Sequence, residues 1–341
     1  MTHNIATLGE LLAAAGTQWR VYDIGRRITK IDKQEFAQIE QSTRPYPYPL
    51  QRHAHIAIQF WDKSATQDPY VWFLKLPLDE QSKLVLASRD HFANMVIEAI
   101  GTQLTGEQAQ GKLDNNPYVF TPNANKLAAF NALMKVELKR PASQYYEAVE
   151  HYFSAPLIHD WQTLALQGIA DFAMRLNHGN NLALLQQQFT ALPEQVQQPL
   201  CAMLEHVAIP VTLSEMLLRQ LQNALEQQHQ GQAINCLRAL SGAPTEAFIA
   251  TAIDAILASE LSSDTDVLLT ISGRGWQTLT HSERLFAFLE QTAQVPLDGF
   301  FAGIFADLVA IPTLRPHVLA ILRAPSRSDS LSRAIGKLFS A

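Results

Sequence analysis

The sequence feature that most constrains the fold is a repeat of 33 to 35 residues in the second half of the chain. Each copy has an apolar stretch, a short break, and then a Thr before another apolar stretch. A pair of short helices cannot bury its apolar face alone, so successive pairs stack on one another. The repeat therefore predicts an all-α right-handed helical repeat array, similar to a HEAT-like α-solenoid. The repeated threonines, which lie 33, 35 and 33 residues apart, are Thr212, Thr245, Thr280 and Thr313.

The breaks in this repeat carry signals for the start of a second helix. Thr is a favourable N-cap because its hydroxyl accepts a hydrogen bond from a free N–H of the first turn. Glu215 and Glu283 stand three residues after Thr212 and Thr280, which is the spacing of a capping box. These threonines are therefore predicted to cap the second helix of each pair. Prolines, which helix interiors tolerate poorly, fall in the breaks at Pro210, Pro244 and Pro312.

The distribution of charge divides the chain near residue 140. The net charge is −6, but residues 1–140 hold 16 Lys and Arg against 14 Asp and Glu, whereas residues 141–341 hold 10 against 18. Such a shift in composition indicates a change of architecture. We therefore expect a small α+β domain with an antiparallel sheet at 1–110, a linking loop and helix at 111–140, and a helical repeat domain at 141–341.

Within the first domain, the strand signals are the clearest. HIAIQFW (residues 55–61) alternates apolar and other side chains, and YVWFLKL (residues 70–76) is almost entirely apolar or aromatic. Two such runs joined by a polar loop are typical of an antiparallel hairpin, and QWRVYDI (residues 18–24) indicates a further strand. The helices predicted around them cover residues 5–15, 32–40, 84–103 and 123–139.

Targeting and cysteine signals favour the cytoplasm. The first residues lack a basic region, and Glu10 interrupts their apolar run, so no signal peptide is expected. No apolar stretch reaches the ~18 residues that a membrane helix needs. Cys201 and Cys236 are too few for a disulfide framework and lie one repeat apart, which predicts two buried core positions. We expect a cytoplasmic protein with no membrane partner.

Standard catalytic and cofactor motifs are absent from the sequence. It contains no P-loop, no GxGxxG, no HExxH and no GxSxG. His53 and His55 lie on one face of a predicted strand, but a metal site needs three or four ligands. Ser88, Asp90 and His91 are too close in sequence to converge as a triad. We therefore expect no metal and no cofactor. The missing motifs are only weak evidence against an enzyme, because many active sites have no linear signature.

The candidate binding residues lie in a basic segment, residues 19–52. Arg presents a planar fork that matches carboxylates and phosphates, and Tyr supplies rigid contact area. This composition predicts an Arg/Tyr-rich binding patch. The alternative is a solvated hairpin with a proline-stiffened connection, whose charges pair with one another. The candidate residues are Asp23, Arg26, Arg27, Arg44, Tyr46, Tyr48 and Arg52.

Four segments resemble an uncharacterised gammaproteobacterial family that is catalogued only as a domain of unknown function. They are VYDIGRRI (21–28), RPYPYPLQRHA (44–54), WFLKLPLDEQ (72–81) and SRDHF (88–92). The resemblance extends over the whole chain and is densest before residue 95. It implies a bacterial origin and a cytoplasmic setting, and it brings no activity and no site residues.

Three functions are compatible with these features. The repeat surface and the Arg/Tyr-rich patch favour a protein-binding or scaffold module, because a helical array offers an extended binding surface. Alternatively, Arg26, Arg27 and Arg52 hold an anionic small molecule in an enzyme, with Asp23 or Asp79 as the base. An RNA-associated protein is a third possibility, although the acidic repeat domain would repel a polyanion and confine it to the first domain.

Overall fold

A computed structural model describes residues 7–61, 69–101, 116–154 and 160–340. The chain forms two compact units. The first comprises Met1–Pro122 together with Ala306–Pro316, and the second comprises Asn123–Phe305 together with His317–Ala341. The second unit begins within the segment 111–140 that the sequence suggested as a linker, because the helix there packs on other helices of the second unit.

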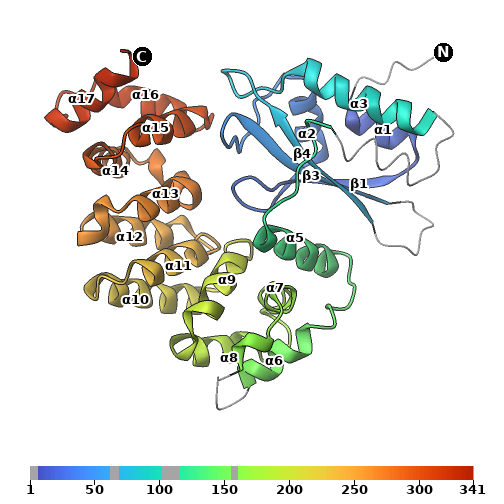
Figure 1. The fold of residues 1–341 in the computed structure, drawn as a ribbon, viewed down its shortest axis with the longest axis horizontal. Helices are drawn as coiled ribbons and strands as arrows, with labels where there is room; N and C mark the ends of the chain where they lie inside the picture. Colours follow the sequence, from blue (N-terminus) through green and yellow to red (C-terminus); the bar gives the residue numbers. More distant parts are fainter. Residues whose placement is uncertain (1–6, 62–68, 102–115, 155–159, 341) are drawn as a thin grey trace. The chain divides into compact units, whose positions relative to one another are not determined.

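The first unit contains a four-stranded antiparallel sheet in the order β2-β1-β3-β4 (Figure 1). The predicted hairpin is confirmed, with Ile56 opposite Leu74 and Ile58 opposite Trp72. The predicted first strand is also confirmed and pairs with the third, with Val21 opposite Ile58. The strands are β1 (Gln18–Asp23), β2 (Thr29–Ile31), β3 (His53–Trp61) and β4 (Tyr70–Pro77).

Three helices pack against one face of this sheet and complete an α+β core. They are α1 (Leu8–Ala14), α2 (Lys33–Glu40) and α3 (Leu86–Gly101). Phe36 of α2 and Phe92 of α3 are fully buried with Ile56 and Ile58 of the sheet. Gly16, just after the first helix, has a φ of 71°, a left-handed conformation that favours glycine at a helix C-terminus.

A buried carboxylate joins α2 to α1. Glu40 is 1% exposed, and its two oxygens accept hydrogen bonds from the backbone N–H groups of Leu8 (2.7 Å) and Gly9 (3.0 Å). Burial raises the pKa of Glu40 from 4.5 to about 7, against the lowering effect of these N–H groups and of Arg89. The folded state therefore holds this proton between pH 4.5 and 7, where the unfolded chain releases it.

We therefore predict that stability falls as the pH rises through this window. The contribution of the Glu40 proton is fully present below pH 4.5 and is lost as the pH rises through 7, a loss of about 3 kcal/mol. Glu40→Gln cannot ionise and should remove this fall, leaving an offset that does not vary with pH. Urea unfolding across the window measures the difference, and Glu35→Gln on the same helix is the control. If the free energy of unfolding of the wild type and of Glu40→Gln changed in parallel with pH, the raised pKa of Glu40 would be contradicted.

The second unit is helical, and its helices follow one another in successive pairs (Figure 1). The first helix of a pair contacts the first helix of the next pair, as α9 contacts α11 and α11 contacts α13, and α10, α12 and α14 are related in the same way. Helices α15 and α16 contribute residues to both units. The bounds are α5 (Ala124–Glu137), α6 (Tyr146–Ser154), α7 (Leu166–Met174), α8 (Asn181–Gln188), α9 (Glu194–Leu204), α10 (Val211–Glu226), α11 (Gln230–Leu240), α12 (Glu246–Leu257), α13 (Thr265–Arg274), α14 (Ser282–Gln294), α15 (Phe300–Ala310), α16 (Arg315–Ile321) and α17 (Asp329–Leu338), with short 3-10 turns at Trp161–Thr163, Phe189–Ala191, Glu260–Ser263 and Trp276–Thr280.

The predicted threonine caps at Thr212 and Thr280 are wrong, and the one at Thr245 is right in position only. Helix α10 begins at Val211 directly after Pro210, so Thr212 already lies inside its first turn. Thr280 ends a 3-10 turn, and its hydroxyl donates to the Gln277 carbonyl instead of accepting from a helix N–H. Thr245 does occupy the N-cap of α12, but its side chain makes no capping hydrogen bond. The period of the repeat is thus visible in the sequence. The residue at which each helix begins, and whether its side chain caps the helix, depend on the turn before it.

The two cysteines are buried core residues, as predicted. Cys201 and Cys236 are both 0% exposed and carry free thiols. Burial raises the pKa of the Cys236 thiol to about 12, and burial together with the neighbouring Cys236 raises that of Cys201. Both thiols therefore stay protonated and act as small apolar groups.

No helix in the described part of the chain combines the length and the apolar composition that crossing a membrane requires.

Candidate functional site

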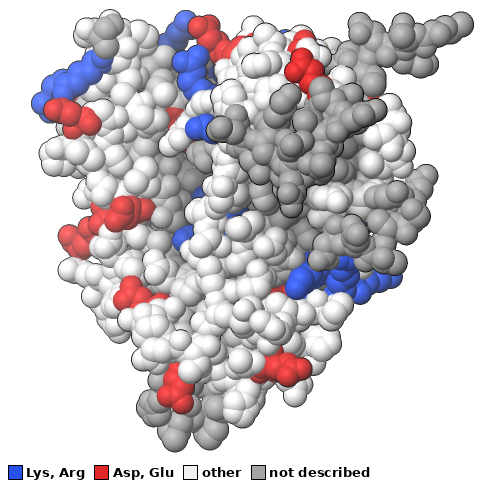
Figure 2. Space-filling model, turned by 45° about the vertical axis from the view of Figure 1, so that its right-hand side comes forward, with Lys and Arg blue, Asp and Glu red and all other residues white. Residues whose placement is uncertain are grey.

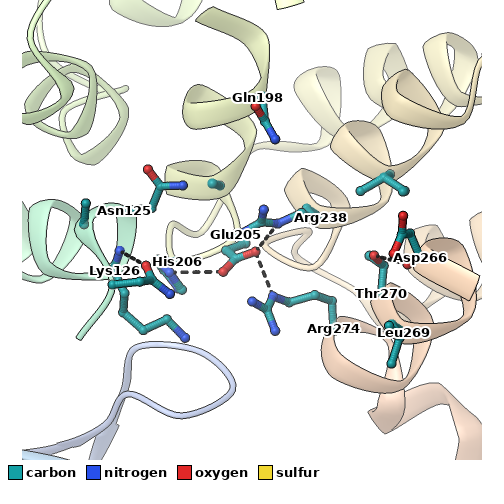
Figure 3. A pocket seen from close by; sticks show the side chains of 14 residues that line it. Asn125, Lys126, Gln198, Glu205, His206, Arg238, Asp266, Leu269, Thr270 and Arg274 are labelled. Atoms are coloured by element: carbon teal, nitrogen blue, oxygen red, sulfur yellow. Dashed lines mark hydrogen bonds and ion pairs between the residues drawn. The ribbon is translucent and has the colours of Figure 1, made fainter. Parts of the chain in front are cut away.

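The second unit contains a hollow of about 630 Å³ between α5, the end of α9, α11 and α13 (Figure 3). This volume lies in the usual range of ligand sites in proteins, about 300–1,000 Å³. Its charged lining side chains are Lys126, Glu205, Arg238, Asp266 and Arg274. The hollow therefore brings together residues that are far apart in the sequence.

Glu205 is the centre of this cluster. Its side chain is 1% exposed, and its Oε2 accepts hydrogen bonds from the Nε atoms of Arg238 and Arg274, both at 2.8 Å. The Nε2 atom of His206 lies 3.2 Å from the other carboxylate oxygen. Figure 3 shows the carboxylate between the two arginines and the histidine. One buried acid thus fixes the positions of two arginine side chains.

The charges around Glu205 keep it ionised. Burial raises its pKa, but the charges of Arg274, His206 and Arg238 outweigh burial and hold the pKa well below its usual range. An acid with such a low pKa does not exchange a proton near neutral pH. Glu205 therefore orients the arginines and does not serve as a general acid or base.

The outer ends of the two arginines remain available for a ligand. Arg238 and Arg274 are 22% and 21% exposed. Within the described part of the chain, no residue accepts a hydrogen bond from the Nη atoms of Arg238, and Nη1 of Arg274 donates only to the Gly273 carbonyl at 3.2 Å. Guanidinium groups held in this way are prepared to bind a carboxylate or a phosphate.

Helix α5 adds positive potential to the hollow. Asn123 caps this helix, with its side chain accepting from the N–H of Lys126 at 2.9 Å. The first residues of the helix, Asn123 to Lys126, line the hollow, so the positive end of the helix dipole faces it. The lining therefore combines three cationic side chains with this helix start, against Glu205 and Asp266.

Three charged residues of the cluster lie at similar positions in the repeat, and Asp307, which belongs to the first unit and not to the cluster, continues the series. Glu205 and Arg238 lie seven residues before the threonine of their repeat, and Arg274 and Asp307 lie six residues before theirs. Each is at or near the C-terminal end of the first helix of its pair. A charged residue recurring at intervals of 33 and 36 residues was the sequence signal for this site. The apolar positions and the breaks, which predict the helices, do not reveal this recurrence.

Part of the predicted Arg/Tyr-rich patch forms a buried network in the first unit. Asp23, Arg26 and Tyr46 are at most 1% exposed. Asp23 accepts hydrogen bonds from the Tyr46 hydroxyl (2.6 Å) and from the backbone N–H groups of Gly25, Arg26 and Arg27 (3.2–3.4 Å). The Asp23 and Tyr46 side chains therefore pair inside the unit, in agreement with the alternative that polar groups of this segment pair internally.

Arg26 holds the segment Ala306–Pro316, which belongs to the same unit. Its Nη2 donates to the Asp307 carboxylate at 2.7 Å and its Nε donates to the Pro49 carbonyl at 3.0 Å. The Ser82 hydroxyl donates to the Ala310 carbonyl, close to the end of the same helix. The sequence segments around Arg26, Pro49 and Ser82 thus serve to fix residues from the far end of the chain.

The other candidate residues lie at or near the surface of the first unit. Arg44 is 52% exposed and pairs with Glu35 at 3.0 Å. Arg52 is exposed, and Arg27 and Tyr48 are half-buried. Their role as a binding patch stays a prediction.

The other residues considered from the sequence, a possible base and two possible metal ligands, lie in the first unit. Asp79 accepts from the N–H groups of Gln81 and Lys83, both at 2.8 Å, and so closes a turn. The rings of His53 and His55 lie 6.2 Å apart. No group of three or more His, Cys, Asp or Glu side chains in the described ranges could hold a metal ion.

Comparison with known proteins identifies the family. Searches of curated proteins and of solved structures found no match. The family model described as "Protein of unknown function (DUF3549)" matches residues 3–339, which confirms the resemblance of the sequence to a family of unknown function. Because this match covers essentially the whole chain, the chain belongs to the DUF3549 family.

Proposed function

We propose that this protein is a non-enzymatic binding or scaffold protein that holds an acidic segment of a partner protein in the hollow at Arg238 and Arg274. In this proposal the helical unit is a right-handed HEAT-like α-solenoid, and the exposed members of the Arg/Tyr-rich patch, Arg44 and Arg52, add a second contact surface. The protein acts in the bacterial cytoplasm, where its two cysteines remain thiols.

The solenoid assignment is supported by the repeat and by the contacts between successive helix pairs. The first helices α9, α11 and α13 contact one another in order, and so do the second helices α10, α12 and α14. Regular nearest-neighbour packing of this kind is what a repeat of 33 to 35 residues requires. Stacked pairs present an extended surface on which several repeats contribute to one site.

The observation that carries the proposed function is the pair of arginines held by one buried acid. Their Nε atoms are occupied by Glu205, whereas Nη atoms remain at the hollow. Because the side chains are already oriented, a ligand does not have to order them, which reduces the entropic cost of binding. A carboxylate fits because the arginine fork matches its two oxygens.

An acidic protein segment fits this hollow better than the other two ligand classes. Asp266 and the acidic excess of residues 141–341 would repel the continuous negative charge of RNA. Glu205 is paired with two arginines and has a depressed pKa, so it offers no proton for catalysis on a small anion. Separate carboxylates on a peptide can instead approach the arginines individually.

The proposal predicts selective binding of acidic peptides. A fluorescent glutamate-rich peptide should bind the wild type, and Arg238→Lys with Arg274→Lys should weaken binding about tenfold, because lysine keeps the charge but lacks the fork. Fluorescence anisotropy measures both affinities. Arg219→Lys is the matched control, since Arg219 is exposed on α10 and lies outside the hollow.

Three comparisons decide between the candidate functions. Equal affinity of the peptide for the wild type and the Arg238→Lys, Arg274→Lys variant would contradict the proposed site. Equal affinity for a lysine-rich peptide of the same length would contradict the proposed ligand class. Tighter binding of a single-stranded RNA oligonucleotide, lost on Arg44→Ala with Arg52→Ala, would favour the RNA-associated alternative.

A further inference from the structure

A second hollow, of about 860 Å³, lies at the C-terminal end of the helical unit. It is bounded by the end of α14, the loop that follows it, the first turn of α15, and one face of α17. We infer that this hollow is a docking groove for an amphipathic helix of a partner protein, with acidic side chains one turn apart beside an apolar stripe. Residues of the first hollow do not line it, so this groove is separate from the site proposed above.

One wall of the groove is basic. Ser330, Arg333, Ala334 and Lys337 line it from α17, at the spacing of one helix face. Arg333 and Lys337 are both exposed. Among the described residues, Arg333 makes hydrogen bonds only within its own helix, at 3.2 and 3.4 Å. Figure 2 shows Lys and Arg side chains at the end of the helical unit where α16 and α17 lie in Figure 1. Two cations one turn apart can pair with two acids one turn apart on an opposing helix.

The basic wall has a fixed position in the unit. Leu331 and Ile335, on the other side of α17, are buried, and α17 contacts α14. The start of the helix is held as well, because the backbone N–H of Ser328 donates to Glu290 of α14 at 2.9 Å. An incoming helix therefore meets cations on an ordered element and does not have to order the wall.

The opposite part of the groove is apolar. Leu297, in the loop between α14 and α15, lines this part and is 57% exposed. Phe301, on the first turn of α15, also lines the groove and stacks on Phe305 with ring centroids 5.8 Å apart. An apolar stripe beside a basic wall is the arrangement in which an amphipathic helix lays its apolar face into a groove.

Charge and surface chemistry favour this occupant over others. Arg333 and Lys337 outnumber the single acid of the lining, Asp298, so the groove favours an acidic partner. The apolar lining would be left exposed by an extended nucleic acid, whose contacts with phosphates are polar. A helix that carries both leucines and glutamates covers both parts of the groove.

The test uses a designed helical peptide with leucines on one face and two glutamates one turn apart beside them. We expect this peptide to bind the full chain, and Arg333→Glu with Lys337→Glu to weaken binding at least about tenfold. Both residues are exposed, so the variant should keep its fold, which circular dichroism checks. Arg323→Glu is the matched control, because Arg323 is exposed and does not line the groove. A peptide with lysines in place of the glutamates should bind the reversed variant better than the wild type.

The outcomes separate this groove from the first hollow. The Arg238→Lys, Arg274→Lys variant should bind the helical peptide with the affinity of the wild type. The experiment can therefore contradict one of the two proposed sites without contradicting the other. Equal binding of the glutamate peptide to the wild type and to Arg333→Glu with Lys337→Glu would overturn the inference. So would a wild-type dimer that this variant dissociates in analytical ultracentrifugation, which would make a second copy of the chain the occupant. Binding of anionic vesicles in place of the peptide would also overturn it.

Discussion

Replacing both Arg238 and Arg274 by alanine is expected to lower the free energy of unfolding of the helical unit by about 3–5 kcal/mol. The reason is that Glu205, with its side chain 1% exposed, keeps its charge only because cations surround it. Without the two arginines its carboxylate stays buried beside His206, whose Nε2 lies 3.2 Å away. Removing the partners of a buried charge is costly because the desolvation penalty is no longer offset.

A third substitution distinguishes this cause from a simple loss of packing. Adding Glu205→Leu to the double variant should restore most of the lost stability, because the buried charge is then removed. Arg219→Ala on the exposed surface of α10 should change stability by less than about 0.5 kcal/mol. Urea unfolding measures all four proteins. If the triple variant were no more stable than the double variant, lost packing and not the buried charge would be responsible.

The loss of stability in the double alanine variant should also depend on pH. The pKa of Glu205 is held below its ordinary value of 4.5, so the wild type keeps this stabilisation above that pH and loses it as the pH falls below it. In the double alanine variant the stabilising charges are absent. The difference between wild type and variant should therefore narrow in acid.

Asp23→Ala is expected to destabilise the first unit by about 3–5 kcal/mol. Asp23 is 0% exposed and accepts hydrogen bonds from the Tyr46 hydroxyl and from three successive backbone N–H groups. Alanine removes this acceptor from all four donors, although the Tyr46 hydroxyl keeps the His55 carbonyl at 3.3 Å. Asp23→Asn, which keeps one acceptor oxygen, should cost less than alanine.

Two further variants calibrate the effect of Asp23. Tyr46→Phe removes one donor and should cost about 1–2 kcal/mol, and its effect should largely disappear in the Asp23→Ala background. Asp32→Ala removes the N-cap of α2, where the carboxylate is exposed, and should cost about 1 kcal/mol. Thermal unfolding of the full chain measures each change. An Asp23→Ala variant no less stable than Asp32→Ala would contradict a structural role for the buried network.

Features that depend on local sequence could be predicted. The hairpin of β3 and β4 follows from the alternation of Ile56, Ile58 and Phe60, and the start of α2 follows from its Asp32 N-cap. The helical character of the second unit follows from the period of its apolar stretches. These signals extend over a few residues, or over one repeat, and need no knowledge of distant contacts.

Features that depend on distant contacts could not be predicted. Tyr46 and Tyr48 alternate with prolines in the same way, yet Tyr46 is fully buried and Tyr48 is not, because Tyr46 reaches Asp23 on β1. The sequence around Arg26 is typical of a surface charge. Its side chain instead pairs with Asp307, which lies 281 positions away and could not be identified from the sequence. The cluster at Glu205 joins residues from three repeats, so only the stacking of the helices shows that they meet.

The most direct test of the central claim is an NMR titration of the arginine Nε–Hε signals with the glutamate-rich peptide. The signals of Arg238 and Arg274, identified by their absence in the single lysine variants, should shift with one saturable affinity. The signal of Arg219 should stay in place. If the peptide bound and shifted only the signals of Arg44 and Arg52, the partner would be held by the first unit, and the proposed site in the helical unit would be wrong.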